Sequence, residues 1–163
     1  MKVAFLLSLG MQCTLAQSFV LPNGTYHFVS RVLDAFGNEL AITNNGLNTA
    51  ITVSPLVRGQ TNQLWPVTNF GTTGNQITVF ATNASLEAGT SGTLPQPLMT
   101  LPNAPFAWAF TVVNGSLTIS DPSFDFHWGI SSPTSGSGVL VQTPAADFLQ
   151  LWIPVLVTGN NFL

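Results

Sequence analysis

The chain has 163 residues, which is enough for one domain with its own hydrophobic core. Only 6% of the residues are charged and 45% are hydrophobic, with three Lys or Arg against six Asp or Glu. So few positive charges exclude a partner that is held through many contacts to phosphates, such as nucleic acid or an anionic membrane surface.

The first 16 residues have the pattern of a secretory signal peptide. A positive start at Lys2 is followed by a short apolar run over residues 3–9 (VAFLLSL) and by small residues that end at Ala16. We expect cleavage after Ala16, a secreted, extracellular domain over residues 17–163, and no membrane insertion, because no stretch reaches ~18 unbroken apolar residues. Cleavage also removes Cys13, the only cysteine, so the mature domain has no disulfide.

The mature chain is predicted to be all-β. Short segments rich in β-branched and aromatic residues are separated by clusters of Gly, Asn, Pro and Ser. No window combines a helical period with a cap at each end. The expected strands cover residues 25–33, 50–53, 75–80, 106–113, 139–143 and 151–157.

A repeat runs through these strands. The segment 62–67 (NQLWPV) matches 149–155 (LQLWIPV), and 106–112 (FAWAFTV) keeps the tryptophan but not the glutamine. Trp65, Trp108 and Trp152 are therefore spaced 43 and 44 residues apart. Strand starts repeat as well, since 23–26 (NGTY) matches 114–117 (NGSL). The pattern predicts three repeats, over about residues 19–69, 70–113 and 114–158.

Three repeats of four strands predict a β-trefoil. A propeller needs about four blades or more, and a β-sandwich does not explain the tryptophan spacing. Closure into a barrel also removes exposed sheet edges, which are an aggregation hazard in so apolar a chain. In this fold the repeated residues have a structural role: the tryptophans point into the core, and the glutamine amides satisfy backbone groups. These residues are Gln63, Trp65, Trp108, Gln150 and Trp152.

With its Gln-X-Trp motifs, the sequence over residues 19–158 resembles the ricin-B-type β-trefoils. It is similar to small secreted fungal lectin-like proteins and to family 13-like carbohydrate-binding modules. The resemblance implies a non-enzymatic protein that binds a polysaccharide or glycan. It also implies a shallow sugar pocket in each repeat, built from an early acidic residue, a later aromatic residue and an Asn directly before Gln-X-Trp.

The resemblance assigns candidate sugar-binding residues in each repeat. In the first repeat Asn62 precedes Gln-X-Trp, while Ala41 replaces the acidic residue. In the second repeat Glu87 stands at the acidic position. In the third repeat His127 lies at or near that position, and Leu149 replaces the Asn. The candidates are therefore Glu87, Asn62 and His127, and no repeat keeps the full set.

Three Asn-X-Ser/Thr sequons make the protein a candidate glycoprotein in the secretory pathway. They begin at Asn23, Asn83 and Asn114, and none has Pro at its middle position. Each Asn also suits a turn.

The sequence has few residues suited to catalysis, so we expect neither enzymatic activity nor a metal or cofactor. The only histidines, His27 and His127, lie 100 residues apart, and no Gly-X-Ser-X-Gly motif occurs. On a strand, Asp125 and His127 would share one face while Phe124, Phe126 and Trp128 pack into the core. Asp121 is close to Asp125, but Asp121-Pro122 is typical of a turn and not of a paired-carboxylate hydrolase.

Two alternatives to a lectin remain at this point. Some β-trefoils are protease inhibitors that present one rigid loop, and the segments 93–97 (TLPQP) and 132–136 (SPTSG) are candidate loops. The chain also fits a secreted structural or interaction protein that has lost sugar binding.

Overall fold

The computed structural model describes residues 17–70, 74–77, 86–102 and 106–158. The expected signal peptide and the sequon at Asn83 lie outside these residues. Within them, strands dominate, and helix is confined to two short 3₁₀ turns, η1 (Thr61–Gln63) and η2 (Phe148–Gln150). No helix in the described part is long and apolar enough to cross a membrane.

Each repeat supplies four strands. The first repeat holds β2 (Gly24–Ser30), β3 (Leu40–Thr43), β4 (Thr52–Pro55) and β5 (Trp65–Phe70). The second holds β6 (Gly74–Ile77), β7 (Leu86–Gly89), a third strand split into β8 (Gln96–Pro97) and β9 (Met99–Pro102), and β10 (Ala109–Val113). The third holds β11 (Ser116–Ser120), β12 (His127–Ile130), β13 (Val139–Gln142) and β14 (Trp152–Leu156). An additional strand, β1 (Gln17–Phe19), pairs with β10.

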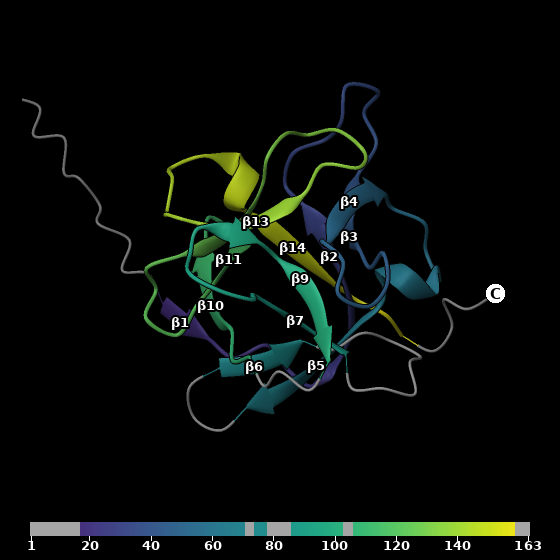
Figure 1. The fold of residues 1–163 in the computed structure, drawn as a ribbon. Helices are drawn as coiled ribbons and strands as arrows, with labels where there is room; N and C mark the ends of the chain where they lie inside the picture. Colours follow the sequence, from purple (N-terminus) through teal and green to yellow (C-terminus); the bar gives the residue numbers. More distant parts are fainter. Residues whose placement is uncertain (1–16, 71–73, 78–85, 103–105, 159–163) are drawn as a thin grey trace, which may run out of the picture.

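The first and last strands of the repeats form a closed barrel (Figure 1). Strand β2 pairs with β5 and β14, β11 pairs with β10 and β14, and β5 pairs with β6. Strand β6 lies against β10 and closes the ring. The remaining strands form three hairpins, β3–β4, β7–β9 and β12–β13. This arrangement is the β-trefoil that the repeats predict.

A closed triangle of backbone hydrogen bonds marks the threefold axis. Ile51 N–H donates to the carbonyl of Leu98 (2.8 Å), Leu98 N–H to Val139 (2.8 Å), and Val139 N–H to Ile51 (2.9 Å). All three side chains are fully buried. This triangle also explains why β4 begins at Thr52 and not at the predicted residue 50: the backbone at Ile51 pairs across the axis with another repeat.

The repeated tryptophans make the same hydrogen bond three times. Their indole N–H groups donate to a carbonyl in the second strand of the same repeat: Trp65 to Ile42 (3.1 Å), Trp108 to Ala88 (2.8 Å) and Trp152 to Trp128 (3.1 Å). Ile42, Ala88 and Trp128 are therefore equivalent positions. By this register the residues just before them are equivalent too, namely Ala41, Glu87 and His127.

The buried glutamine of each Gln-X-Trp motif holds the loop that precedes its 3₁₀ turn. Gln63 Oε1 accepts from Val57 N–H (2.8 Å), and its Nε2 donates to Ser54 Oγ (2.8 Å) and to the carbonyl of Pro55 (3.0 Å). Gln150 Oε1 accepts from Ala145 N–H (2.7 Å), and its Nε2 donates to the carbonyl of Thr143 (2.9 Å). Buried amides with these partners stabilise the loop at the edge of each repeat.

Candidate functional site

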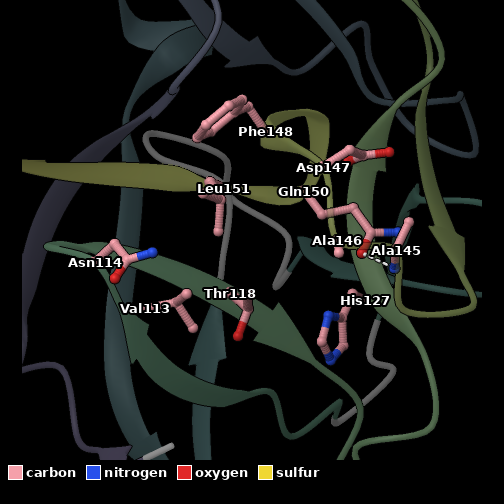
Figure 2. A pocket seen from close by; sticks show the side chains of 10 residues that line it. All are labelled: Val113, Asn114, Thr118, His127, Ala145, Ala146, Asp147, Phe148, Gln150 and Leu151. Atoms are coloured by element: carbon pink, nitrogen blue, oxygen red, sulfur yellow. Dashed lines mark hydrogen bonds between the residues drawn. The ribbon is translucent and has the colours of Figure 1, made fainter. Parts of the chain in front are cut away.

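The third repeat contains a hollow of about 380 Å³ between β11 and η2 (Figure 2). Figure 2 shows Asn114 at one end, His127 at the other and Thr118 between them, with Leu151 and Phe148 on the opposite wall. The walls combine apolar side chains with a hydroxyl, an imidazole, an amide and a carboxylate. The lining residues are Val113, Asn114, Thr118, His127, Ala145, Ala146, Asp147, Phe148, Gln150 and Leu151.

Two local hydrogen bonds hold the backbone of the opposite wall, which carries Phe148, in place. Asp147 caps η2, because its carboxylate accepts a hydrogen bond from Leu149 N–H (3.1 Å). Gln150 fixes the loop before η2 through Ala145, as described above. With the backbone anchored at both places, the ring of Phe148 remains 65% exposed at the rim. The backbone of this wall is therefore held by hydrogen bonds within the protein.

A glycine in the neighbouring strand makes room for Gln150. A Cβ at Gly129 would come within 2.9 Å of Gln150 Cγ and 2.6 Å of Gln142 Nε2. Gly89 occupies the equivalent position in the second repeat, where a Cβ would come within 2.6 Å of the Phe106 ring. Phe106 therefore takes the space that the glutamine takes in the third repeat, and its ring stacks on Trp108 at 5.6 Å.

His127 is the titratable group that faces the hollow from β12. Burial lowers the pKa of His127 below its ordinary value, and the charge of Asp121 and a hydrogen bond with Gln150 oppose this effect. The imidazole is therefore neutral at pH 7 and offers one donor and one acceptor nitrogen.

The equivalent space in the first repeat is nearly closed, at about 10 Å³. The strand pairing establishes the equivalence: Tyr26 lies opposite Trp65, and Leu117 lies opposite Trp152. One residue further on, His27 in the first repeat therefore corresponds to Thr118 in the third. The wall residues correspond as well, since Val113 and Val157 each stand five residues after a repeated tryptophan.

His27 fills the first repeat's space. Its side chain is 2% exposed, and its Nδ1–H donates to the carbonyl of Gln63 at 3.0 Å. Burial lowers the pKa of His27, and the charge of Arg58 adds to the effect, while the bond to Gln63 opposes it. Thr118, which is shorter, leaves the corresponding space in the third repeat open.

The structure places the three predicted sugar-binding residues in different settings. His127 lines the hollow. Glu87 is 4% exposed, and its Oε2 accepts from Phe106 N–H (3.3 Å), so it is a buried carboxylate and not a surface group. Asn62 is half-buried in the first repeat, where its carbonyl accepts from Asn44 N–H (2.8 Å). The three residues lie in three different repeats, as the repeat assignment implies, and His127 is the one that lines the hollow described here.

Two expectations for the third repeat are wrong. Phe124 and Asp125 lie in a turn, not on a strand, because β12 begins at His127. Asp121 closes this turn, since its Oδ1 accepts from Phe126 N–H (2.8 Å) and its Oδ2 accepts from the Ser123 hydroxyl. The turn puts Phe124 at φ +63° with its ring 47% exposed, so this aromatic does not reach the core.

Neither candidate inhibitor loop projects freely from the fold. In the first segment, Leu94 packs against the core, and Gln96 and Pro97 pair with β13. In the second, Gly136 N–H donates to the carbonyl of Val53 (2.7 Å), which ties the loop to β4. The protease-inhibitor alternative therefore gains no support.

Sequence reasoning missed most of the hollow. Thr118, Phe148 and Asp147 carried no motif, and Asn114 was noted only as a sequon. The alignment of 23–26 with 114–117 contained a usable signal, because extending it pairs His27 with Thr118. In the part of the chain that the structure describes, no three His, Cys, Asp or Glu side chains come together as a metal site.

Comparison with known proteins now assigns the class. A mosquitocidal holotoxin superposes with a TM-score of 0.72 at 14% identity over 85% of this chain, which spans 18% of the toxin. The Rhizoctonia solani agglutinin gives 0.66 at 19% identity, covering 85% of this chain and 99% of its own. A ricin B-like lectin from Macrolepiota procera gives 0.66 at 17% identity, with the same coverage. At these identities the likeness defines the fold, that of the ricin B-like β-trefoils.

The family follows from the sequence itself. The model of the CCL2 lectin-like family matches residues 24–152, so the chain belongs to that family. This is a carbohydrate-binding, lectin-like module, as the Gln-X-Trp resemblance predicts. A search of curated protein sequences returns no match.

Proposed function

We propose that this protein is a secreted lectin that binds a sugar unit of a glycan or polysaccharide in the hollow of the third repeat. Binding is non-covalent and needs no metal or cofactor. The hollow brings together Thr118 from β11, His127 from β12 and Phe148 from η2, three elements of the third repeat. This convergence is the observation that carries the proposal.

The chemistry of the walls suits a sugar. A pyranose presents hydroxyl groups, which donate and accept hydrogen bonds, and a C–H face, which is apolar. The Thr118 hydroxyl, the neutral His127 imidazole and the Asn114 amide provide both donors and acceptors. The exposed Phe148 ring and the Leu151 side chain provide apolar surface for the C–H face.

The lack of positive charge around the hollow favours a neutral sugar as the ligand. The structure of the Macrolepiota procera lectin is a complex with lactose. The present chain holds few positive charges, and none of the residues that line the hollow is Lys or Arg. An uncharged sugar is therefore a better ligand than a sulfated or phosphorylated one.

The same walls argue for binding without hydrolysis. A glycosidase of the common kind needs two carboxyl groups on either side of the bond that it cleaves. Asp147 is the only acidic residue among those lining the hollow, and its carboxylate caps η2. Secretion rests on the signal-peptide pattern of residues 1–16.

A glycan and polysaccharide array that includes lactose tests the proposal, with Phe148→Ala beside the wild type, each produced in bacteria so that no N-glycan is attached. Phe36→Ala is the matched control, because Phe36 is 90% exposed but does not line the hollow. We expect wild-type binding that free sugar competes away, a loss of roughly tenfold or more for Phe148→Ala, about 1.4 kcal/mol, and no change for Phe36→Ala. Equal binding by all three proteins would place the sugar elsewhere.

A further inference from the structure

We propose that Asn114 carries an N-linked glycan that covers the mouth of the hollow, so that glycosylation switches sugar binding off. The inference rests on the proposed function, because it assumes that the hollow is the sugar site and that the chain enters the secretory pathway. Two sequons lie in the described residues, at Asn23 and Asn114, and only the one at Asn114 has this role.

The turn at Asn114 presents the acceptor amide to solvent. Asn114 and Gly115 form the two-residue connection between β10 and β11, because Val113 pairs with Ser116. Both have positive φ angles, +50° and +75°, which suits the tight turns preferred in hairpins. Asn114 is exposed at this tip, and Ser116 completes the sequon.

The position of Asn114 decides what a glycan there would do. Asn114 is one of the residues that line the hollow, and Figure 2 shows it at the end opposite His127. A glycan grows from the side-chain amide nitrogen, so its first sugar begins at the wall of the site. A branched N-glycan is bulky and hydrophilic, and it excludes a second saccharide from the same mouth.

Asn23 is a natural control within the same molecule. It stands at the equivalent position before β2, and its Oδ1 accepts from Asn69 N–H (2.8 Å). It does not line the space in the first repeat, which His27 fills. A glycan on Asn23 therefore has no open site to cover.

The test compares glycosylated with unglycosylated protein while the residues that line the hollow stay the same. Ser116→Ala removes the sequon and keeps Asn114, and Ser116→Thr keeps both. The hydroxyl that Ser116→Ala deletes is buried and accepts one long hydrogen bond from Arg31 (3.4 Å), so the variant should fold. Thr25→Ala removes the Asn23 sequon as the matched control. All are expressed through a eukaryotic secretory pathway, and mass spectrometry of peptides reports occupancy.

We expect wild type and Ser116→Thr to carry a glycan at Asn114 and to bind the array sugars at least tenfold more weakly than Ser116→Ala. Wild type produced in bacteria, which leaves Asn114 unmodified, should bind as tightly as Ser116→Ala, and Thr25→Ala should behave as wild type. An unoccupied Asn114, or equal binding with and without its glycan, overturns this inference and leaves the proposed function standing. Loss of binding in every form, protein produced in bacteria included, overturns both.

Discussion

The first and third repeats share a backbone arrangement but differ in one buried space. In the third repeat Thr118 leaves a hollow of about 380 Å³, whereas in the first repeat His27 reduces the equivalent space to about 10 Å³. The histidines are exchanged between the repeats: the first has His27 and Ala41, and the third has Thr118 and His127 at the same two positions. A β-trefoil repeat can thus gain or lose a pocket at one side chain while its framework is kept.

The largest expected effect is the loss in the free energy of unfolding when a motif glutamine is replaced. Gln63→Leu leaves Val57 N–H and the carbonyl of Pro55 without a partner and should cost about 3 kcal/mol. Gln150→Leu removes two hydrogen bonds at a more open edge and should cost about 2 kcal/mol. Urea unfolding measures both, and a larger cost for Gln150→Leu would contradict the comparison.

The next largest loss in the free energy of unfolding should come from replacing His27, which fills the space in the first repeat. His27→Thr removes a buried ring and its hydrogen bond to Gln63, and we expect a loss of about 2 kcal/mol in the free energy of unfolding. A crystal structure should show an open hollow beside Val157. His127→Thr is the control, because that ring is only half-buried and its loss should cost less than about 1 kcal/mol.

The reverse exchange should close the third repeat's site. Thr118→His introduces the larger side chain, and affinity for the best array sugar should fall at least tenfold, or ~1.4 kcal/mol. Titration calorimetry at pH 7 measures the affinity, and Thr118→Ser is the control that keeps both the hydroxyl and the space. Unchanged affinity of Thr118→His would show that sugar does not enter this hollow.

The smallest expected effect is a dependence of stability on pH. Burial lowers the pKa of both histidines in the folded state, so the unfolded chain binds protons more readily below pH 6.5. The free energy of unfolding should therefore fall as the pH drops from 6.5 toward the folded pKa values. His27→Thr should flatten this dependence, as followed by thermal unfolding between pH 7 and pH 5. An unaltered pH profile for His27→Thr would assign the effect to other groups.

Asp34 should contribute in a separate, more acidic window. Hydrogen bonds from the Asn38 side chain and backbone and from Phe36 N–H lower the pKa of this exposed carboxyl. Its contribution to stability is complete above about pH 3.8, the ordinary value, and is lost below it. The pH range in which the histidines change the stability and the more acidic range in which Asp34 does so can therefore be separated in one measurement of stability against pH.

Much of the fold could be predicted because about half of the strands carry their own local signal and the tryptophans recur at a fixed spacing. The spacing of Trp65, Trp108 and Trp152 predicted three repeats, and each indole makes the same hydrogen bond in the structure. Local patterns failed where a distant segment or an unforeseen turn decided the outcome. The sequence predicts that residues 50 and 51 belong to a strand, but the backbone of Ile51 forms hydrogen bonds with Leu98 and Val139 at the threefold axis. The sequence predicts that Phe124 packs into the core, but the turn closed by Asp121 exposes its ring.

The sequence by itself determined the all-β class, the threefold repeat, the lectin-like family and the near absence of charge. The all-β class and the low charge depend on composition and local periodicity, the threefold repeat depends on the spacing of the tryptophans, and the family rests on the Gln-X-Trp resemblance and the family model. Only the tertiary structure decided which repeat has an open site. The floor of the hollow comes from Thr118, the far end from His127 and the opposite wall from Phe148, and these residues meet through the pairing of β11 with β12 and β14. Whether a space remains depends on the volume of a side chain such as His27 against walls that lie far away in the sequence.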